Sequence, residues 1–332
     1  MTDISAFPKR QLGKSGIAVA PVGLGCMSLS GAYGPSSDDD GIALVHAAID
    51  SGVTLIDTSD MYGAGHNEKL LARALKGRRD KVVLATKFGN LGGKDGKYAD
   101  GRPEFVVQSC DASLERLEVD VIDLYYQHRI DPSVPIEDTV GAVKKLIEAG
   151  KVRAFGLCEA RPATIRRAHK VHPVAAVQNE FSLLYRVEAE ETLPTLRELG
   201  ISFVPYSPIG RGMLSASIPS ASALANDDPR RRHPRYAGDN LAVNLDLVSR
   251  ITTVAKEKGC TPAQLALAWL LARGNDIIPI PGTRRKDRLA ENLGALNVKL
   301  SDADVKRLSD AIPVGAAAGT RYPEAQLASL YI

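Results

Sequence analysis

Four polar side chains follow apolar runs of the sequence, at positions where predicted β-strands end. Residues 54–56 form an apolar run that turns polar at Asp57 and leads into a glycine-flanked loop carrying Tyr62. The run KVVLATK ends on Lys87, and the run DVIDLYYQH ends on His128. Apolar runs of this length are typical of buried parallel strands. Because the carboxyl ends of such strands meet at one mouth of a barrel, the four side chains are predicted to share a catalytic site.

These residue types suit proton transfer to an oxygen on which negative charge develops, as on a carbonyl group that accepts a hydride. Tyr62 is the candidate acid, although a free tyrosine has a pKa of about 10. An ammonium at ~4 Å and an effective dielectric of ~20 favours the phenolate by about 4 kcal/mol, so Lys87 is predicted to lower that pKa by roughly three. Asp57 would hold the ammonium in place, and His128 would orient the carbonyl group.

Each of the four residues also has an ordinary structural explanation. An Asp after a strand commonly caps a turn, and a tyrosine beside a glycine can pack within a loop. A lysine at a strand end can extend into solvent, and a single histidine is more often a hydrogen-bonded polar residue than a catalyst. Their occurrence at three successive strand ends favours the catalytic interpretation.

Eight predicted strands alternate with helices, which indicates an α/β fold of the (β/α)8 TIM-barrel type. A β-hairpin is predicted to close the bottom of the barrel, an extra C-terminal helix carries an S-x-x-D cap, and long loops are expected at the mouth. A chain of 332 residues fits one such domain, residues 1–332. The hairpin is predicted at 10–19, the strands at 21–26, 54–56, 82–87, 120–127, 153–158, 175–180, 201–206 and 277–283, the helices at 37–51, 67–75, 103–117, 136–149, 161–169, 188–199, 245–258, 262–272, 286–293 and 301–311, and a long irregular segment at 207–240.

The motifs IDTSDMYG, GHNEKLLARALKGRRDKVVLATKFG and LYYQH occur in this order along the chain. Together they resemble the aldo-keto reductase superfamily, and most of all its bacterial and plant branch with perakine-reductase-like and auxin-induced-protein-like members. The resemblance extends from GLGCM at residues 23–27 to RLAENL at residues 288–293, which is nearly the whole chain. It implies for the four strand-end residues the roles described above, and NADPH as the cofactor.

The segment PGTRRKDRLAEN at residues 281–292 follows the last predicted strand and opens a helix, a place where phosphate groups bind well. Its four clustered basic residues favour NADPH over NADH, because arginine suits planar phosphate contact. A solvated basic start of a helix is the alternative interpretation. The resemblance makes this segment the site of the adenosine 2′-phosphate and implicates Gly282, Thr283, Arg284, Arg288, Glu291 and Asn292.

The resemblance also assigns residues nearer to the reacting centre. Gln178 matches the residue that binds the nicotinamide amide, and Tyr206 matches the aromatic residue that stacks on the nicotinamide ring. Cys158 and Glu159 stand where the family often has Ser and Asn, and a thiol is a weaker hydrogen-bond partner than a hydroxyl. The loop over the pyrophosphate is matched by Ser207, Pro208, Ile209, Gly210 and Arg211.

Composition predicts a cytoplasmic protein, and the resemblance implies a small-molecule substrate. The net charge of +3 gives no strong expectation of a nucleic-acid or membrane partner. Four widely spaced cysteines, without a CxxC pair or a zinc-type cluster, predict reduced thiols and no metal site. The N-terminus lacks the apolar core of a signal peptide, and no apolar run reaches the ~18 residues of a membrane span. The basic run at residues 227–235 is predicted to be a mobile solvated loop near the cofactor.

The leading hypothesis is NADPH-dependent reduction of an aldehyde or ketone to an alcohol, with Tyr62 as the general acid. One alternative is a barrel lyase that uses Lys87 as a Schiff-base nucleophile. Another is a nucleotide-bound, non-catalytic regulatory subunit of a different protein. Monomer and homo-oligomer are both left open. The substrate pocket is expected near Cys26, Met27, Tyr33, Phe88, Arg129, residues 207–240 and the C-terminal tail.

Overall fold

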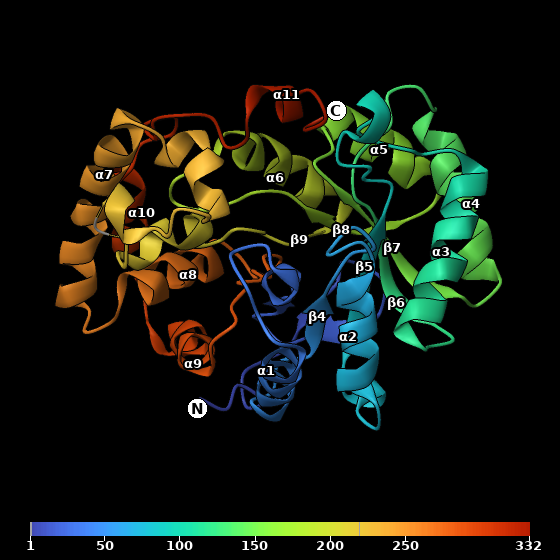
Figure 1. The fold of residues 1–332 in the computed structure, drawn as a ribbon, viewed down its shortest axis with the longest axis horizontal. Helices are drawn as coiled ribbons and strands as arrows, with labels where there is room; N and C mark the ends of the chain where they lie inside the picture. The colour runs from blue at the N-terminus through green and yellow to red at the C-terminus, as the bar shows by residue number, and fades with distance from the viewer. Residues whose placement is uncertain (1, 219) are drawn as a thin grey trace.

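A computed structural model describes residues 2–218 and 220–332 of the chain. Within these residues, seven parallel strands form one curled sheet, and neighbours in the sheet follow one another along the chain. Helices surround the strands, as predicted for a barrel of the α/β class (Figure 1). The strands are β3 (Leu24–Gly25), β4 (Leu55–Asp57), β5 (Val83–Phe88), β6 (Ile122–Gln127), β7 (Val152–Cys158), β8 (Val174–Gln178) and β9 (Ser202–Phe203).

The central strands are buried along their length, which explains their apolar sequences. Every residue of β5, β6 and β8 is buried, because one face of each strand meets the barrel interior and the other meets the helices. Asp57 pairs in register with Ala85, and Lys87 with Tyr126. Both polar residues therefore lie towards the carboxyl end of the sheet, as the sequence predicted.

Residues 277–283, predicted as the eighth strand, do not form a continuous strand. Only isolated bridges join this segment to β9 and to β3 within the described residues. Pro279 and Pro281 have no N–H to donate, so the regular ladder is interrupted. Their carbonyl oxygens still accept hydrogen bonds from Gly23 at 3.0 Å and Gly25 at 3.5 Å. The segment thus closes the barrel between β9 and β3 with a sparse set of bonds.

The helices lie close to their predicted positions, and α3 has the predicted bounds. The main difference is α7, predicted from residue 245, which begins at Asp239. Asn244 lies inside this helix, where its amide donates to the carbonyl groups of Arg235 and Ala318 at 3.0 and 2.9 Å. The helices are α1 (Asp38–Asp50), α2 (His66–Leu75), α3 (Pro103–Leu117), α4 (Ile136–Glu148), α5 (Pro162–Val171), α6 (Val187–Leu199), α7 (Asp239–Glu257), α8 (Pro262–Ala272), α9 (Lys286–Gly294), α10 (Asp302–Ala311) and α11 (Glu324–Leu327).

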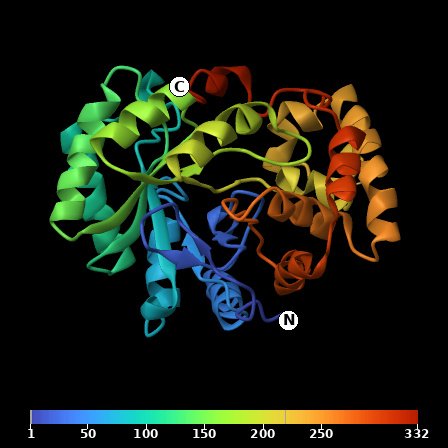
Figure 2. The same ribbon diagram turned by 180° about the vertical axis from the view of Figure 1, so that it is seen from behind.

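The predicted N-terminal hairpin is confirmed. Strands β1 (Arg10–Gln11) and β2 (Ala18–Val19) pair antiparallel, and Figure 2 shows the molecule from behind, with the N-terminal segment crossing the strands. Leu12, Ile17 and Val19 are buried in the same cluster as apolar side chains of the barrel strands. The hairpin therefore fills the amino-terminal end of the barrel and leaves the carboxyl end for a site.

The segment 207–240 was predicted to be irregular, but it contains short 3₁₀ turns. They lie at Gly210–Ser215, Ala221–Ala223, Pro229–Arg232 and Pro234–Tyr236. Two of them start on a proline, which suits the first position of a helical turn. The basic run at 227–235 is not wholly solvated as predicted, because Arg235 is buried and pairs with Glu180 at 2.8 Å.

The tail beyond α10 packs back onto the barrel and ends near α5 (Figure 1). The guanidinium of Arg321 lies 2.7 Å from the buried carboxylate of Glu159. The backbone N–H of Ile332 donates to the Glu159 carbonyl at 3.2 Å, and the N–H of Arg161 donates to the Ile332 carbonyl at 3.0 Å. The predicted S-x-x-D cap before α10 is confirmed, since Ser301 and Asp304 form a reciprocal capping box.

No helix in the described part of the chain is both long and apolar enough to cross a membrane. Within residues 2–218 and 220–332, no three His, Cys, Asp or Glu side chains come together in a way that could hold a metal ion. All four cysteines carry free thiols.

Candidate active site

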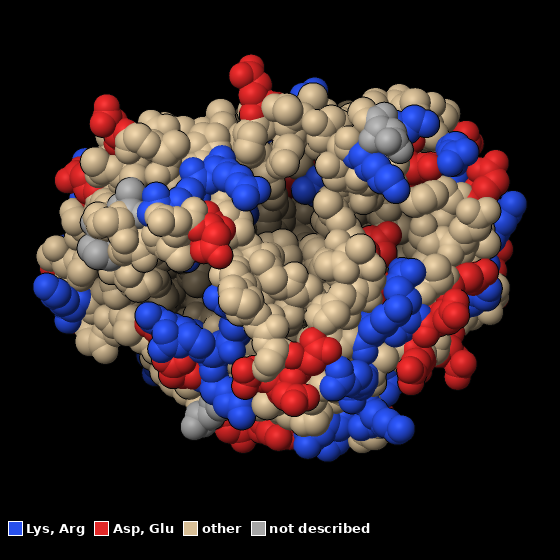
Figure 3. Space-filling view, viewed as in Figure 1, with Lys and Arg blue, Asp and Glu red and all other residues tan. Residues whose placement is uncertain are grey.

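A cavity of about 650 Å³ opens at the carboxyl ends of the strands. Its wall is built by the loops after β3 and β4, the start of the 207–240 segment, the start of α9 and the C-terminal tail. Figure 3 shows a hollow near the centre of the face seen in Figure 1, with Lys and Arg side chains around it. Elements far apart in the sequence therefore contribute to one site.

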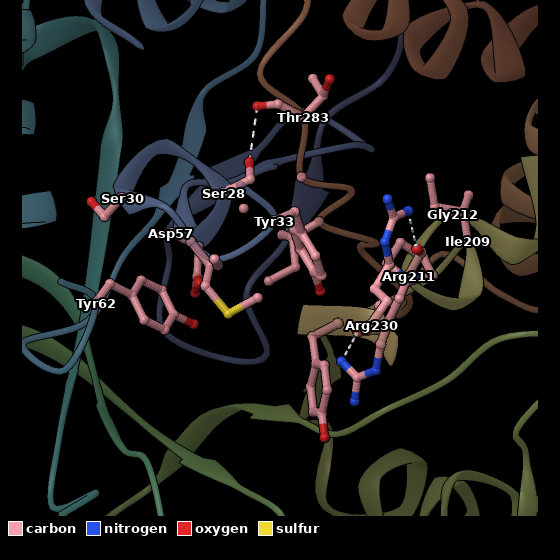
Figure 4. Close-up of a pocket in the computed structure, with 18 of the residues that line it drawn as sticks. Ser28, Ser30, Tyr33, Asp57, Tyr62, Ile209, Arg211, Gly212, Arg230 and Thr283 are labelled. Carbon is pink, nitrogen blue, oxygen red and sulfur yellow. Dashed lines mark hydrogen bonds between the residues drawn. The ribbon is translucent and has the colours of Figure 1, made fainter. Parts of the chain in front are cut away.

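Asp57, Tyr62 and Lys87 are in direct contact at one end of this cavity, where Figure 4 shows Asp57 and Tyr62. The Lys87 ammonium donates to the Asp57 carboxylate at 2.5 Å and to the Tyr62 hydroxyl at 3.2 Å. A third bond goes to the Thr58 carbonyl at 2.7 Å, so each of its N–H groups has an acceptor. The His128 ring lies edge-on to the Tyr62 ring, with centroids 6.0 Å apart. The structure thus brings together the four residues predicted from the strand ends.

The Lys87–Asp57 ion pair is buried, with side-chain exposures of 0% and 2%. Burial lowers the pKa of Lys87, but Asp57 and Tyr62 outweigh it, so the pKa lies above its ordinary value. Burial raises the pKa of Asp57, while the Lys87 charge and a hydrogen bond from the Gln178 amide at 2.8 Å oppose that change. Short, charge-assisted contacts on both carboxylate oxygens favour the ionised pair.

The pKa of Tyr62 differs from the sequence prediction. Burial raises the pKa of Tyr62 to about 12, although the Lys87 charge lowers it. The prediction of a lowered pKa was wrong because it counted the cation and neglected the desolvation of the phenolate. It also neglected Asp57, whose negative charge offsets that of Lys87. At neutral pH Tyr62 therefore carries the proton that a general acid must donate.

His128 is held as a neutral imidazole. Its pKa lies well below the ordinary value because of burial and because of the charges of Arg129 and Lys87. Its Nδ1 lies 3.1 Å from the hydroxyl of Ser59, and that hydroxyl lies 3.0 Å from the carboxyl group of Asp60. When Ser59 donates its single proton to Asp60, the ring proton of His128 sits on Nδ1 and is donated to Ser59. When Ser59 donates to Nδ1 instead, the ring proton sits on Nε2, which is the tautomer that can donate to a ligand.

Most residues predicted to hold the cofactor line the same cavity. Glu159 and Gly210 do not line it. The Glu159 carboxylate is buried against Arg321, and the Gly210 carbonyl accepts a hydrogen bond from the Tyr236 hydroxyl at 3.1 Å. These two residues support the wall from behind. The predicted residues that do line the cavity are Cys158, Gln178, Tyr206, Ser207, Pro208, Ile209, Arg211, Gly282, Thr283, Arg284, Arg288, Glu291 and Asn292.

A comparison with protein-family models matches residues 21–313 to the aldo/keto reductase family. The chain belongs to this family. Aldo/keto reductases are oxidoreductases that act on carbonyl groups with a nicotinamide cofactor, which agrees with an acid–base cluster beside a long cavity.

The relatives of this aldo/keto reductase align over nearly its full length. The probable aldo-keto reductase 1 of Glycine max is 49% identical over 331 residues, which cover 97% of this chain and 93% of that protein. The solved glycerol dehydrogenase AKR11B4 from Gluconobacter oxydans has a TM-score of 0.83 at 27% identity and covers 92% of this chain and 95% of its own. The holo form of the aldo-keto reductase AKR11C1 from Bacillus halodurans has a TM-score of 0.76 at 28% identity, covering 96% and 99%.

In this aldo/keto reductase, polar groups at the start of α9 are already held in place. Arg284 donates to a backbone carbonyl of the loop after β3 at 2.8 Å, and Arg288 pairs with Glu291 at 2.6 Å. The Ser28 hydroxyl donates to the Thr283 carbonyl at 3.0 Å, as drawn in Figure 4. Guanidinium groups and a hydroxyl beside the N-terminus of a nine-residue helix suit a phosphate group.

The sequence did not single out Ser28, Arg230 or Tyr322, which line the cavity, although residues 207–240 and the C-terminal tail were expected near the pocket. Arg230 belongs to the basic run interpreted as solvated, and Tyr322 belongs to the tail, where no periodic pattern gives a signal. Figure 4 places Arg230 beside Arg211, at the opposite end of the cavity from Tyr62. Both segments thus contribute to the cavity, as expected from the sequence, but the individual residues were not predicted.

Two residues expected near the substrate pocket are buried away from it. Phe88 packs on Tyr125 with ring centroids 4.7 Å apart, because alternation along β5 directs it away from Lys87. Cys26 is fully buried in the core cluster. The other three expected residues, Met27, Tyr33 and Arg129, line the cavity as predicted.

Proposed function

We propose that this chain reduces the carbonyl group of an aldehyde or ketone to an alcohol, with NADPH as hydride donor and Tyr62 as general acid. The observation that carries the proposal is the hydroxyl of Tyr62, which lines the cavity and lies 3.2 Å from the buried Lys87 ammonium. A protonated phenol beside a fixed cation is suited to give a proton to an oxygen that is becoming an alkoxide.

The proton balance follows from the residues present. NADPH, when bound, supplies the hydride that the carbonyl carbon receives. The carbonyl oxygen takes the proton of Tyr62, and the tyrosinate left behind is stabilised by Lys87 until solvent returns a proton. His128 is neutral, and in the tautomer with its proton on Nε2 it would donate a hydrogen bond that orients the carbonyl oxygen. Asp57 keeps Lys87 charged and fixed throughout.

The cavity has groups suited to both ends of the cofactor. Gln178 and Tyr206 lie near the catalytic cluster and would hold the nicotinamide, while residues 207–211 would contact the pyrophosphate. Thr283, Arg284 and Arg288 would hold the adenosine 2′-phosphate. This phosphate distinguishes NADPH from NADH, so the guanidinium groups at α9 support a preference for NADPH.

The two other functions considered for the sequence have less support. A Schiff-base lyase needs a neutral, accessible amine, but Lys87 is fully buried and its pKa is raised beside Asp57. A purely regulatory subunit does not need a protonated tyrosine, a lysine and a histidine converging at a cavity. The intact cluster supports a catalyst.

The test is the Tyr62→Phe variant, assayed for NADPH oxidation with a generic aromatic aldehyde such as 4-nitrobenzaldehyde. Loss of the acid is expected to lower kcat by about 10²–10⁴-fold, while NADPH binding, followed by fluorescence, is retained. The matched control is Tyr125→Phe, which removes a buried hydroxyl outside the cavity that has no hydrogen-bond partner in the described structure. Full activity of Tyr62→Phe would contradict the proposal.

A further inference from the structure

Arg129 is a buried cation without a carboxylate partner. Its exposed fraction is 8%, and no Asp or Glu among residues 2–218 and 220–332 lies within ion-pair distance of it. The other buried arginines of the described chain all have such a partner. Those pairs are Arg186–Glu190 at 3.5 Å, Arg235–Glu180 at 2.8 Å and Arg321–Glu159 at 2.7 Å.

Arg129 follows His128 directly and lines the catalytic cavity. One of its N–H groups donates to the His128 carbonyl at 2.7 Å. Its other N–H groups donate to no protein atom in the described part of the chain. An arginine side chain presents five N–H donors in a planar fork, so most of this fork is left for another acceptor.

The charge of Arg129 is maintained in spite of burial. Burial lowers its pKa, but interactions with Tyr322, Tyr206 and Glu159 outweigh burial and leave the pKa above its ordinary value. An arginine is not deprotonated in a protein in any case. The two carboxylates that line the cavity do not neutralise it, because Asp57 is paired with Lys87 and Glu291 with Arg288. Burying a charge is costly unless it is paired. The missing partner of Arg129 is therefore expected among the cavity's ligands.

We propose that Arg129 binds a carboxylate carried by the carbonyl substrate, so that the chain acts on keto acids or aldehyde acids. This inference rests on the proposed reductase function and specifies its substrate class. The fork geometry of a guanidinium matches the two oxygens of a carboxylate. Because Arg129 adjoins His128, the anion would be anchored at the end of the cavity where the carbonyl group reacts, far from the basic residues of α9.

The experiment compares two aldehydes that differ in one charge, 4-formylbenzoate and its neutral methyl ester, in the holoenzyme. For the natural sequence, kcat/KM is expected to be about tenfold or more higher for the acid, as a charge-assisted hydrogen bond provides. In Arg129→Met this ratio falls to about one, and in Arg129→Lys it lies between. Arg232→Met removes the same charge from an exposed position outside the cavity and should keep the ratio of the natural sequence.

Binding of benzoate, measured by calorimetry, separates the failure of this inference from the failure of the reductase function. The natural sequence should bind benzoate, and Arg129→Met should bind it about tenfold or more weakly. If neither aldehyde is reduced but benzoate binding depends on Arg129, the reductase proposal fails and the anion site stands. If the acid has no advantage over the ester, or Arg129→Met binds benzoate as well as the natural sequence, the anion site is wrong. An equal loss of kcat for both aldehydes would instead show that Arg129 only positions His128.

Discussion

Lys87 gives its three N–H groups to three different acceptors, one of which is the hydroxyl of Tyr62. This arrangement fixes both the position and the charge of the ammonium, so in the proposed reaction it would not need to reorganise when Tyr62 gives up its proton. Asp57 has a similar role, because its two oxygens accept from Lys87 and Gln178. The three side chains therefore act as a unit, and changes to them should not have additive effects.

The first prediction concerns the stability of this unit. Lys87→Met leaves the Asp57 carboxylate buried without a partner, and the free energy of unfolding should fall by about 3–5 kcal/mol. The double variant Asp57→Asn with Lys87→Met removes both charges and should be more stable than Lys87→Met alone. Urea unfolding, followed by circular dichroism, measures the free energy of unfolding of the single variants and of the double variant. A double variant that loses the sum of the two single losses would show that the residues contribute independently.

The second prediction concerns Asp60, whose pKa is raised to about 6 by burial and by the charge of Glu68 on α2. Ser59 and the Met61 N–H donate to its carboxyl group and Arg116 on α3 faces it, but these lower the pKa less than burial raises it. A raised pKa means that this group contributes stability below about pH 4 and that the contribution is lost as pH rises through about 6. Asp60→Asn should therefore gain stability relative to the natural sequence between pH 4 and pH 8, by roughly 1–3 kcal/mol.

Thermal unfolding across this pH range measures how the stability difference between Asp60→Asn and the natural sequence changes with pH. Asp39→Asn is the matched control, since the side chain of Asp39 is 95% exposed, and its curve should run parallel to that of the natural sequence. Parallel curves for Asp60→Asn and the natural sequence would rule out the raised pKa.

At the residue scale, the sequence predicted which residues belong to the cluster and roughly where they lie, but it did not predict their pKa values. A polar residue at the end of an apolar strand is visible in the sequence, so Asp57, Lys87 and His128 could be identified. The pKa of Tyr62 depends on how completely the phenol is buried, which is a property of the packed cavity. Likewise, the lack of a carboxylate partner for Arg129 among the described residues can be recognised only once the nearby side chains are placed.

At the scale of elements, the strand–helix alternation was predictable because it follows from apolar periodicity. The prediction was wrong for residues 277–283, where the apolar content is high but Pro279 and Pro281 prevent a regular ladder. It was also wrong for the start of α7, which begins at Asp239, so that Asn244 lies inside the helix with its amide hydrogen-bonded to Arg235 and Ala318. The tail gave no periodic signal, and its position depends on contacts such as the buried ion pair of Arg321 with Glu159 and the backbone bonds of Ile332.

The third prediction tests this attachment of the tail. The Arg321 charge holds the pKa of Glu159 below its ordinary value despite burial, which alone would raise it. Arg321→Met should therefore destabilise the chain by about 3–5 kcal/mol at neutral pH, and by less near pH 4, where Glu159 can take up a proton. Chemical denaturation at pH 7.5 and at pH 4 measures the loss in free energy of unfolding that Arg321→Met causes at each pH. Arg167→Met, which breaks an exposed pair with Glu137, should cost far less, and an equal loss at both pH values would argue against the ion pair.

At the scale of the whole molecule, positive charge gathers at the cavity although the net charge is only +3. Arg129, Arg211, Arg230, Arg284 and Arg288 all line it. This concentration favours anionic ligands at both ends of the cavity and weakens with added salt.

The fourth prediction follows for the proposed cofactor. Arg288→Leu should weaken NADPH binding by about tenfold or more while leaving NADH binding nearly unchanged, since only NADPH carries the 2′-phosphate. Dissociation constants measured by fluorescence for both nucleotides test this. Lys286→Met removes the same charge from the same helix, but at an exposed position outside the cavity. It should change the ratio of the NADH and NADPH dissociation constants little. If Arg288→Leu leaves the ratio of the two dissociation constants unchanged, Arg288 does not determine a preference for NADPH over NADH.

The proline-interrupted segment 277–283 has one more consequence. The central strands β5, β6 and β7 pair over four and five residues, but in this segment Pro279 and Pro281 cannot donate to a ladder. The segment leads directly to Gly282 and Thr283 in the cavity wall. Separating this segment from β3 breaks two backbone hydrogen bonds, whereas β5 and β6 are paired over four residues and β6 and β7 over five. We therefore expect local opening between residues 277–283 and β3 to be easier than opening between the central strands. Such opening would admit a long nucleotide to the cavity while the cluster of Asp57, Tyr62, Lys87 and His128 stays in place.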